Sequence, residues 1–116
     1  MENKRNIFRY EEIYETIHKN LNKVYVIVTA ESILFKDKEF KNGLNNSLSR
    51  HAESYQLIES FPNKLRYIIE IDDDKFKLLT DFANQITRDI NFLLEPKGLK
   101  NGECFVKHHT IWIKLP

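Results

Sequence analysis

A stripe of apolar residues at helical spacing runs through positions 72–94 of the chain. It recurs every three or four residues, as in a helix that packs one side against a core. The residues of the stripe are Phe76, Leu79, Phe82, Ala83, Ile86, Ile90, Leu93 and Leu94. Three aspartates open the segment, where carboxylates cap free N–H groups, and Pro96 and Gly98 close it. The pattern predicts one long amphipathic helix.

The rest of the chain alternates between helical and strand periodicity. Strands are predicted over 24–28, 33–40, 65–71 and 105–115, and helices over 8–21 and from about 44 to the residue before Pro62. The residues from Asn42 and Gly43 through Asn46 are typical of a loop that leads into this last helix. The run at 24–28 is apolar at every position, which is typical of a central strand covered on both faces.

The predicted order of elements is α-β-β-α-β-α-β. Helices and strands in this order pack as layers around one core. The sequence therefore predicts an α+β fold in a single globular domain, residues 1–116, with a mixed four-stranded sheet and about three helices.

Composition and charge narrow the class of protein. The 116 residues have a formal net charge of +1, without the basic surplus typical of proteins that bind the phosphate backbone, so nucleic acid is left open but is not indicated. Cys104 is the only cysteine, which argues against a disulfide framework and a cysteine-rich zinc site. No signal-peptide pattern and no apolar run of transmembrane length is present, so a cytoplasmic protein without membrane contact is expected.

The histidines are the first candidates for chemistry. His108 and His109 are neighbours on a predicted strand, so they should point to opposite faces and not share one metal ion. Arg50 and His51, with His108, are the alternative set for a small acid–base site that cleaves RNA. Nothing in their spacing selects that chemistry. We therefore expect no catalytic residues, no metal and no cofactor.

A second signal lies on the outer side of the predicted 72–94 helix. Leu78, Gln85 and Phe92 are seven residues apart, opposite the core stripe, and Asp81 and Asp89 flank them. The only tryptophan, Trp112, lies on the less apolar side of the last predicted strand, where it would rest under a helix or belong to a binding surface. These six residues are the predicted binding residues.

Small size, balanced charge and the lack of a catalytic constellation favour a protein that acts by binding. The first hypothesis is a small protein inhibitor, of the toxin-immunity or phage anti-defence type, that occludes a partner protein through a shaped, charged surface. The alternative is a small RNA-directed nuclease or toxin. The third hypothesis is a dimeric nucleic-acid-binding accessory protein that uses the basic C-terminal segment, and a homodimer is compatible with the stripe as well.

Overall fold

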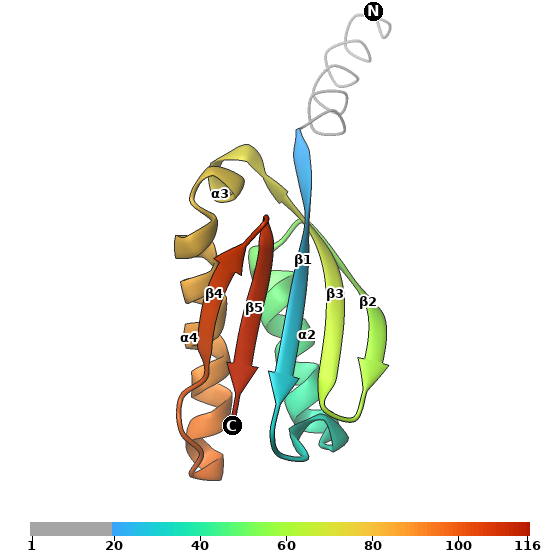
Figure 1. The fold of residues 1–116 in the computed structure, drawn as a ribbon, viewed down its shortest axis with the longest axis vertical. Coiled ribbons are helices and arrows are strands. Elements are labelled where there is room, and N and C mark those ends of the chain that lie inside the picture. The colour runs from blue at the N-terminus through green and yellow to red at the C-terminus, as the bar shows by residue number, and fades with distance from the viewer. Residues whose placement is uncertain (1–19) are drawn as a thin grey trace, which may run out of the picture.

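The computed structural model describes residues 20–116 and shows a five-stranded mixed sheet with helices against one of its faces (Figure 1). The strands are β1 (Leu21–Ala30), β2 (Ser54–Phe61), β3 (Lys64–Asp72), β4 (Glu103–Lys107) and β5 (Thr110–Leu115). The helices are α2 (Lys38–His51), α3 (Asp73–Lys77) and α4 (Leu79–Leu94), with short 3₁₀ turns η1 (Leu34–Lys36) and η2 (Glu95–Lys97). The α+β class is confirmed, and the sheet has five strands where four were predicted. The predicted 8–21 helix lies outside the described residues, apart from its last two positions, and residue 21 begins β1.

The strands are ordered β2-β3-β1-β5-β4, so the apolar 24–28 run does occupy the centre of the sheet. β1 pairs antiparallel with β3 and parallel with β5. Val24, Val26 and Val28 are buried on the side of the helices, while Tyr25 on the other side is 39% exposed. Within residues 20–116, helices cover one face of the sheet only, yet Ile27 on the other face is also buried. The expectation of two covered faces therefore holds at Ile27 and fails at Tyr25.

The core lies between the sheet and the pair α2 and α4. Most of the predicted stripe is fully buried, and Phe76 and Leu93 are half-buried at its margins. Thr87, which falls on the polar side of the predicted helix, is in fact buried, and its Oγ1 donates to the Ala83 carbonyl oxygen at 2.8 Å. The helical phase is therefore confirmed, with a core face wider than the apolar residues alone indicate.

The predicted 72–94 helix begins where expected but is broken near its start. The Asp72 carboxylate accepts a hydrogen bond from the Lys75 backbone N–H at 2.9 Å and caps α3. Leu78 then leaves helical geometry, with φ −114° and ψ 50°, and α4 starts at the next residue. The break allows the short helix α3 to follow β3 directly and α4 to run back along the sheet (Figure 1).

The predicted strand over 33–40 and the predicted loop at 42–46 are both wrong, because α2 spans Lys38–His51. Asp37 caps a helix instead, because its side chain accepts from the backbone N–H groups of Glu39 and Phe40. Gly43 lies inside α2 at its contact with α4. A Cβ atom there would approach Leu93 Cδ1 to 2.7 Å, so glycine serves close helix packing at this position and does not mark a turn.

The predicted helix ending before Pro62 is too long. α2 ends at His51, Ala52 is already extended with ψ 155°, and the following residues form β2. The apolar residues Tyr55 and Ile58 of β2 are three residues apart, so by coincidence they continue the helical spacing of the apolar residues of α2. No glycine or proline separates the two elements, so periodicity alone extends the helix through the break.

The predicted strand over 105–115 is a hairpin. His108 and His109 form a two-residue turn between β4 and β5, with positive φ values of 53° and 56°. Two-residue turns between strands usually contain Asn-Gly or a similar pair, and this turn contains two histidines instead. The two histidines therefore do not alternate along a strand. Both are exposed, and the His109 ring stacks on Phe76, with centroids 5.0 Å apart.

Candidate functional site

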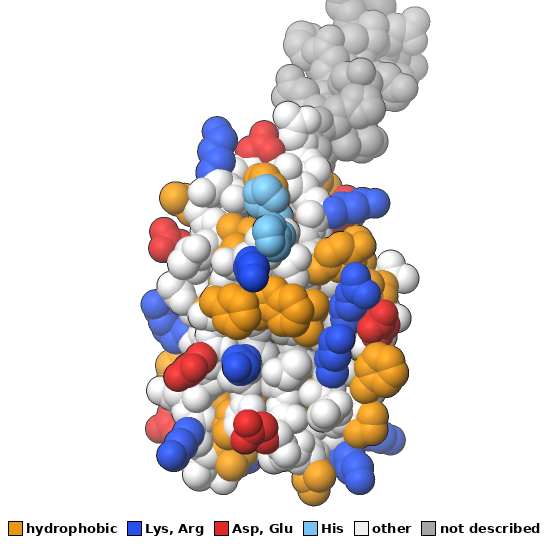
Figure 2. Space-filling view, viewed as in Figure 1, with side chains coloured by type: hydrophobic (Ala, Val, Ile, Leu, Met, Phe, Trp, Pro, Cys, Tyr) orange, Lys and Arg blue, Asp and Glu red, His pale blue; other side chains and the backbone are white. Residues whose placement is uncertain are grey.

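The face of the sheet away from α2 and α4, which we call the open face, presents one row of side chains that crosses all five strands. The register places them side by side in the order Glu59, Arg66, Ile27, Trp112 and Phe105. Figure 2 shows this face, with hydrophobic side chains across its centre and Lys and Arg side chains around them. This row was not predicted as a unit, since Trp112 is the only one of its members among the predicted binding residues.

Phe105 and Trp112 form the aromatic end of the row. They are cross-strand partners on β4 and β5, and their rings are nearly parallel, with centroids 5.9 Å apart and an interplanar angle of 4°. Phe105 is 48% exposed and Trp112 is half-buried. The two rings thus stack on each other, and the exposed part of Phe105 leaves an aromatic surface on which a further flat ring can stack.

Arg66 and Tyr25 continue the face on the two middle strands. The Arg66 guanidinium carbon lies 4.6 Å from the centroid of the Tyr25 ring, and its Nη1 lies 3.1 Å from Glu59 Oε1. A cation over an aromatic ring gains energy from the ring quadrupole. The contacts with Tyr25 and Glu59 hold the guanidinium in place. Its Nε is buried without a hydrogen-bond partner, so one of its donors is unused.

Basic side chains border the row. Residues two positions along each strand share its face, which places Lys23, Lys64, Lys107 and Lys114 on the open face. The acidic residues of this face are Glu59, Glu70, Asp72 and Glu103. Glu59 pairs with Arg66, Glu70 accepts from the Ser54 hydroxyl at 2.8 Å, and Asp72 caps α3. The open face therefore combines exposed aromatic rings with a modest positive surplus.

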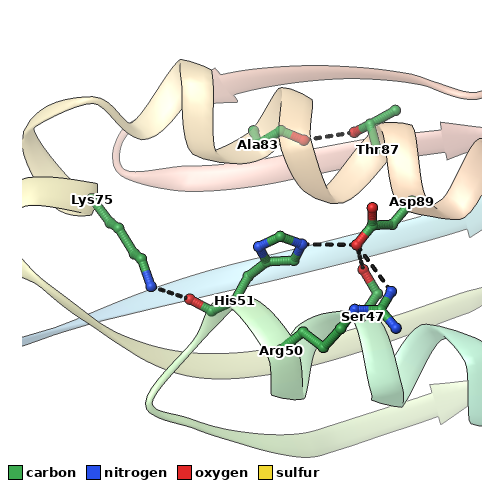
Figure 3. Close-up of polar contacts among 7 residues, drawn as sticks. All are labelled: Ser47, Arg50, His51, Lys75, Ala83, Thr87 and Asp89. Atoms are coloured by element: carbon green, nitrogen blue, oxygen red, sulfur yellow. Dashed lines mark hydrogen bonds and ion pairs between the residues drawn. The ribbon is translucent and has the colours of Figure 1, made fainter.

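A separate polar cluster joins α2 to α4 on the helix side (Figure 3). His51 Nε2, Arg50 Nη2 and the Ser47 hydroxyl all approach the same oxygen, Asp89 Oδ2, at 2.7, 3.0 and 3.3 Å. The Lys75 ammonium donates to the His51 carbonyl oxygen at 2.7 Å and caps the end of α2. The structure thus brings together Arg50 and His51, from the alternative catalytic set, with Asp89, from the predicted binding stripe.

The chemistry of this cluster is that of an ion-paired contact between helices. Partial burial raises the pKa of the Asp89 carboxyl, but hydrogen bonds and charge from His51 and Arg50 outweigh burial and leave the pKa below its usual value. The Ser47 hydroxyl is directed to Asp89 and not to His51, so the three side chains do not form a nucleophile–base relay. His108 belongs to the β4–β5 turn and is not part of this cluster.

The other predicted binding residues lie along the outer side of α4. Leu78, Asp81 and Gln85 line a shallow hollow of about 270 Å³ beside α3. Phe92 lines another, of about 370 Å³, at the far end of the helix. Leu78 and Phe92 are 61% and 64% exposed, so the predicted binding residues of this helix are open to solvent at both of its ends. Trp112 is on the opposite side of the molecule, in the open face.

Within residues 20–116, no group of three His, Cys, Asp or Glu side chains is arranged to hold a metal ion. None of the helices in this part of the chain combines the length and the apolar character needed to cross a bilayer. No family model, no curated protein and no solved structure matches this chain.

Proposed function

We propose that this protein is a non-enzymatic binding protein and that its ligand is single-stranded nucleic acid, bound across the open face. The observation that carries the proposal is the parallel pair Phe105 and Trp112 at the exposed end of a row that spans the sheet. Unpaired bases stack on such rings whatever their sequence, since every base has a π-face. Tyr25 and Arg66 offer a second stacking position on the neighbouring strands.

The charges of the open face support the same ligand. Lys107 and Lys114 flank the Phe105–Trp112 pair on the same side of the hairpin, two residues from it along each strand. Lys23 and Lys64 lie toward the opposite ends of β1 and β3. A strand of nucleic acid whose bases lie on the rings would place phosphates near these ammonium groups. The open face is thus the surface that supports the hypothesis of a nucleic-acid-binding accessory protein, and the basic C-terminal segment forms part of this face.

The chain offers a direct test, because Trp112 is its only tryptophan. A single-stranded ten-nucleotide oligo(dT) should quench the intrinsic fluorescence as a base stacks on the indole, and a self-complementary duplex of equal length should quench it much less. Binding measured independently by anisotropy of a labelled oligonucleotide should be weakened by Phe105→Ala. The matched control Phe92→Ala removes an exposed phenylalanine on α4 and should bind normally. If the oligonucleotide causes no quenching and no change in anisotropy at low salt, the proposal is refuted.

A protein inhibitor remains the second candidate function. The exposed Leu78 and Phe92 on α4 favour it, since large apolar side chains at solvent-exposed helix positions are typical of contacts with another protein. That surface and the open face are on opposite sides of the molecule. Substitutions in one therefore test one function without disturbing the other.

A further inference from the structure

The two edges of the sheet differ in how they are protected against pairing with another strand. β4 is short, and it begins and ends with a charged residue, Glu103 and Lys107. Short length and charged residues both disfavour pairing of an edge strand with another chain. β2 is eight residues long and carries one charged residue, Glu59, which Arg66 already neutralises. Within residues 20–116 nothing pairs with the outer side of β2. Its exposed large apolar residues are Tyr55, Leu57, Ile58 and Phe61.

A bulge in β2 determines how this edge can pair with itself. Leu57 pairs with Tyr67 and Glu59 pairs with Arg66, so Ile58 is an extra residue and the alternation of faces shifts by one at that point. Before the bulge, Gln56 faces the open side and Tyr55 the helix side. After the bulge, odd-numbered Glu59 and Phe61 face the open side, and Ser60 faces the helix side.

The geometry points to a homodimer in which β2 pairs antiparallel with β2 of a second copy about a two-fold axis between Leu57 and Ile58. Residues opposite each other in a sheet must face the same side. In this register Gln56 meets the partner's Glu59, Tyr55 meets the partner's Ser60, and each of these pairs shares a face. Shifting the register by one residue in either direction places Tyr55 opposite a side chain of the wrong face. In this register Ser54 also meets the partner's Phe61 on the open side, so same-face pairs extend over the whole of β2.

The contacts at the axis suit a second copy of this chain. Leu57 meets the partner's Ile58 and the reverse contact follows by symmetry, so half-exposed aliphatic side chains cover one another. No like charges meet, because Glu59 lies opposite an uncharged glutamine. The result is a continuous ten-stranded sheet whose two open faces lie on the same side. This inference does not depend on what the open face binds.

The test is the mass of the full-length protein in solution over a range of concentrations. Sedimentation equilibrium should show a species of twice 13.9 kDa that dissociates on dilution. Ile58→Lys should abolish it, because an ammonium group would be buried at the axis, while Phe92→Lys, a control at an exposed apolar residue on α4, should leave it unchanged. A monomer at all concentrations overturns the proposal, as does a dimer that is sensitive to Phe92→Lys and insensitive to Ile58→Lys.

A cross-link tests the register and does not require a destabilising charge. In a Cys104→Ser background, Tyr55→Cys and Ser60→Cys together should give a disulfide-linked dimer on mild oxidation. Within one strand these positions are roughly 16 Å apart, far beyond the reach of a disulfide. The control pair Tyr55→Cys with Glu59→Cys faces opposite sides and should not cross-link. Absence of the first cross-link, or equal yield from both pairs, overturns the proposed pairing.

Discussion

His51 Nε2 lies 2.7 Å from Asp89 Oδ2, and this contact joins the last turn of α2 to the outer side of α4. The Arg50 guanidinium and the hydroxyl of the buried Ser47, both on the same part of α2, donate to the same oxygen. A single carboxylate oxygen thus receives three groups from α2. Since all three contacts join α2 to α4, Asp89 is a polar determinant of how these two helices pack.

The stability of the protein should therefore depend on pH through Asp89. Its folded-state pKa is lowered below the ordinary value of 3.8, so the carboxylate stabilises the fold above that pH, and this stabilisation is lost as the pH falls through the folded-state pKa. Asp89→Asn should cost about 1–2 kcal/mol at pH 7, since it weakens charge-assisted hydrogen bonds. Urea denaturation at pH 7 and pH 3 should show a smaller acid-induced loss in the variant. An equal loss in both proteins would contradict the assignment.

The core can be tested along α4. Ile86→Ala and Phe82→Ala should each lower the free energy of unfolding by about 2–5 kcal/mol, because each deletes a buried group and leaves a cavity. Thr87→Ala should cost about 1–2 kcal/mol, since Thr87 is buried as well. Thr87→Val keeps the shape of the side chain but removes the hydroxyl that donates to the Ala83 carbonyl oxygen, so it should cost about 0.5–1.5 kcal/mol. Denaturant melts that rank Thr87→Ala as neutral would mean that this side of α4 is solvated.

The sequence predicts those elements in which local pattern and tertiary packing agree. The apolar alternation of β3 and the stripe of α4 are confirmed because each pattern directly records which side is buried. The pattern fails at 33–40 and 44–61, where Asp37 caps a helix that contains a glycine and where no turn residue marks the end of that helix. The Asp37 cap and the close approach of Gly43 to Leu93 both belong to this helix, and the apolar pattern records neither of them.

The candidate surface was predictable only in part for a related reason. Trp112 was recognisable as a lone large residue on the more polar side of its strand. Its partner Phe105 was not, because the turn at His108 and His109 that folds β4 onto β5 lacks the usual turn residues. Tyr25 and Arg66 are 41 positions apart along the chain, and only the register of β1 with β3 brings them together.

The β4–β5 turn should be open to improvement at position 108. His108 is exposed and has φ 53°, a left-handed conformation that asparagine adopts more readily than most residues. His108→Asn should raise the free energy of unfolding by up to about 1 kcal/mol. His108→Val should lower it by about 1–2 kcal/mol, because a β-branched side chain clashes at positive φ. Thermal melts of the two variants test this, and a stabilising valine would show that the turn has another geometry.

Binding to single-stranded nucleic acid should depend on salt in a way that the lysines determine. Each phosphate contact contributes about 0.7 to the slope of log affinity against log salt concentration for a single strand. Lys107→Gln and Lys114→Gln should each lower the slope by about that amount, with little change in fluorescence quenching at saturation. Lys41→Gln, on α2, is the control and should leave the slope unchanged. Equal effects of all three substitutions would indicate that binding is not localised on the open face.

The apolar ends of α4 provide the last test, which separates the two candidate functions. Leu78 and Phe92 are exposed at opposite ends of the helix, and burying each in an interface would stabilise a complex by roughly 1.5–3 kcal/mol. The double substitution Leu78→Glu and Phe92→Glu should leave the thermal melt unchanged, because neither side chain belongs to the core. If a partner protein recovered from the native host binds through this stripe, the double variant should lose at least tenfold in affinity for it, whereas Trp112→Ala should not. The reverse order of effects would assign that partner to the open face.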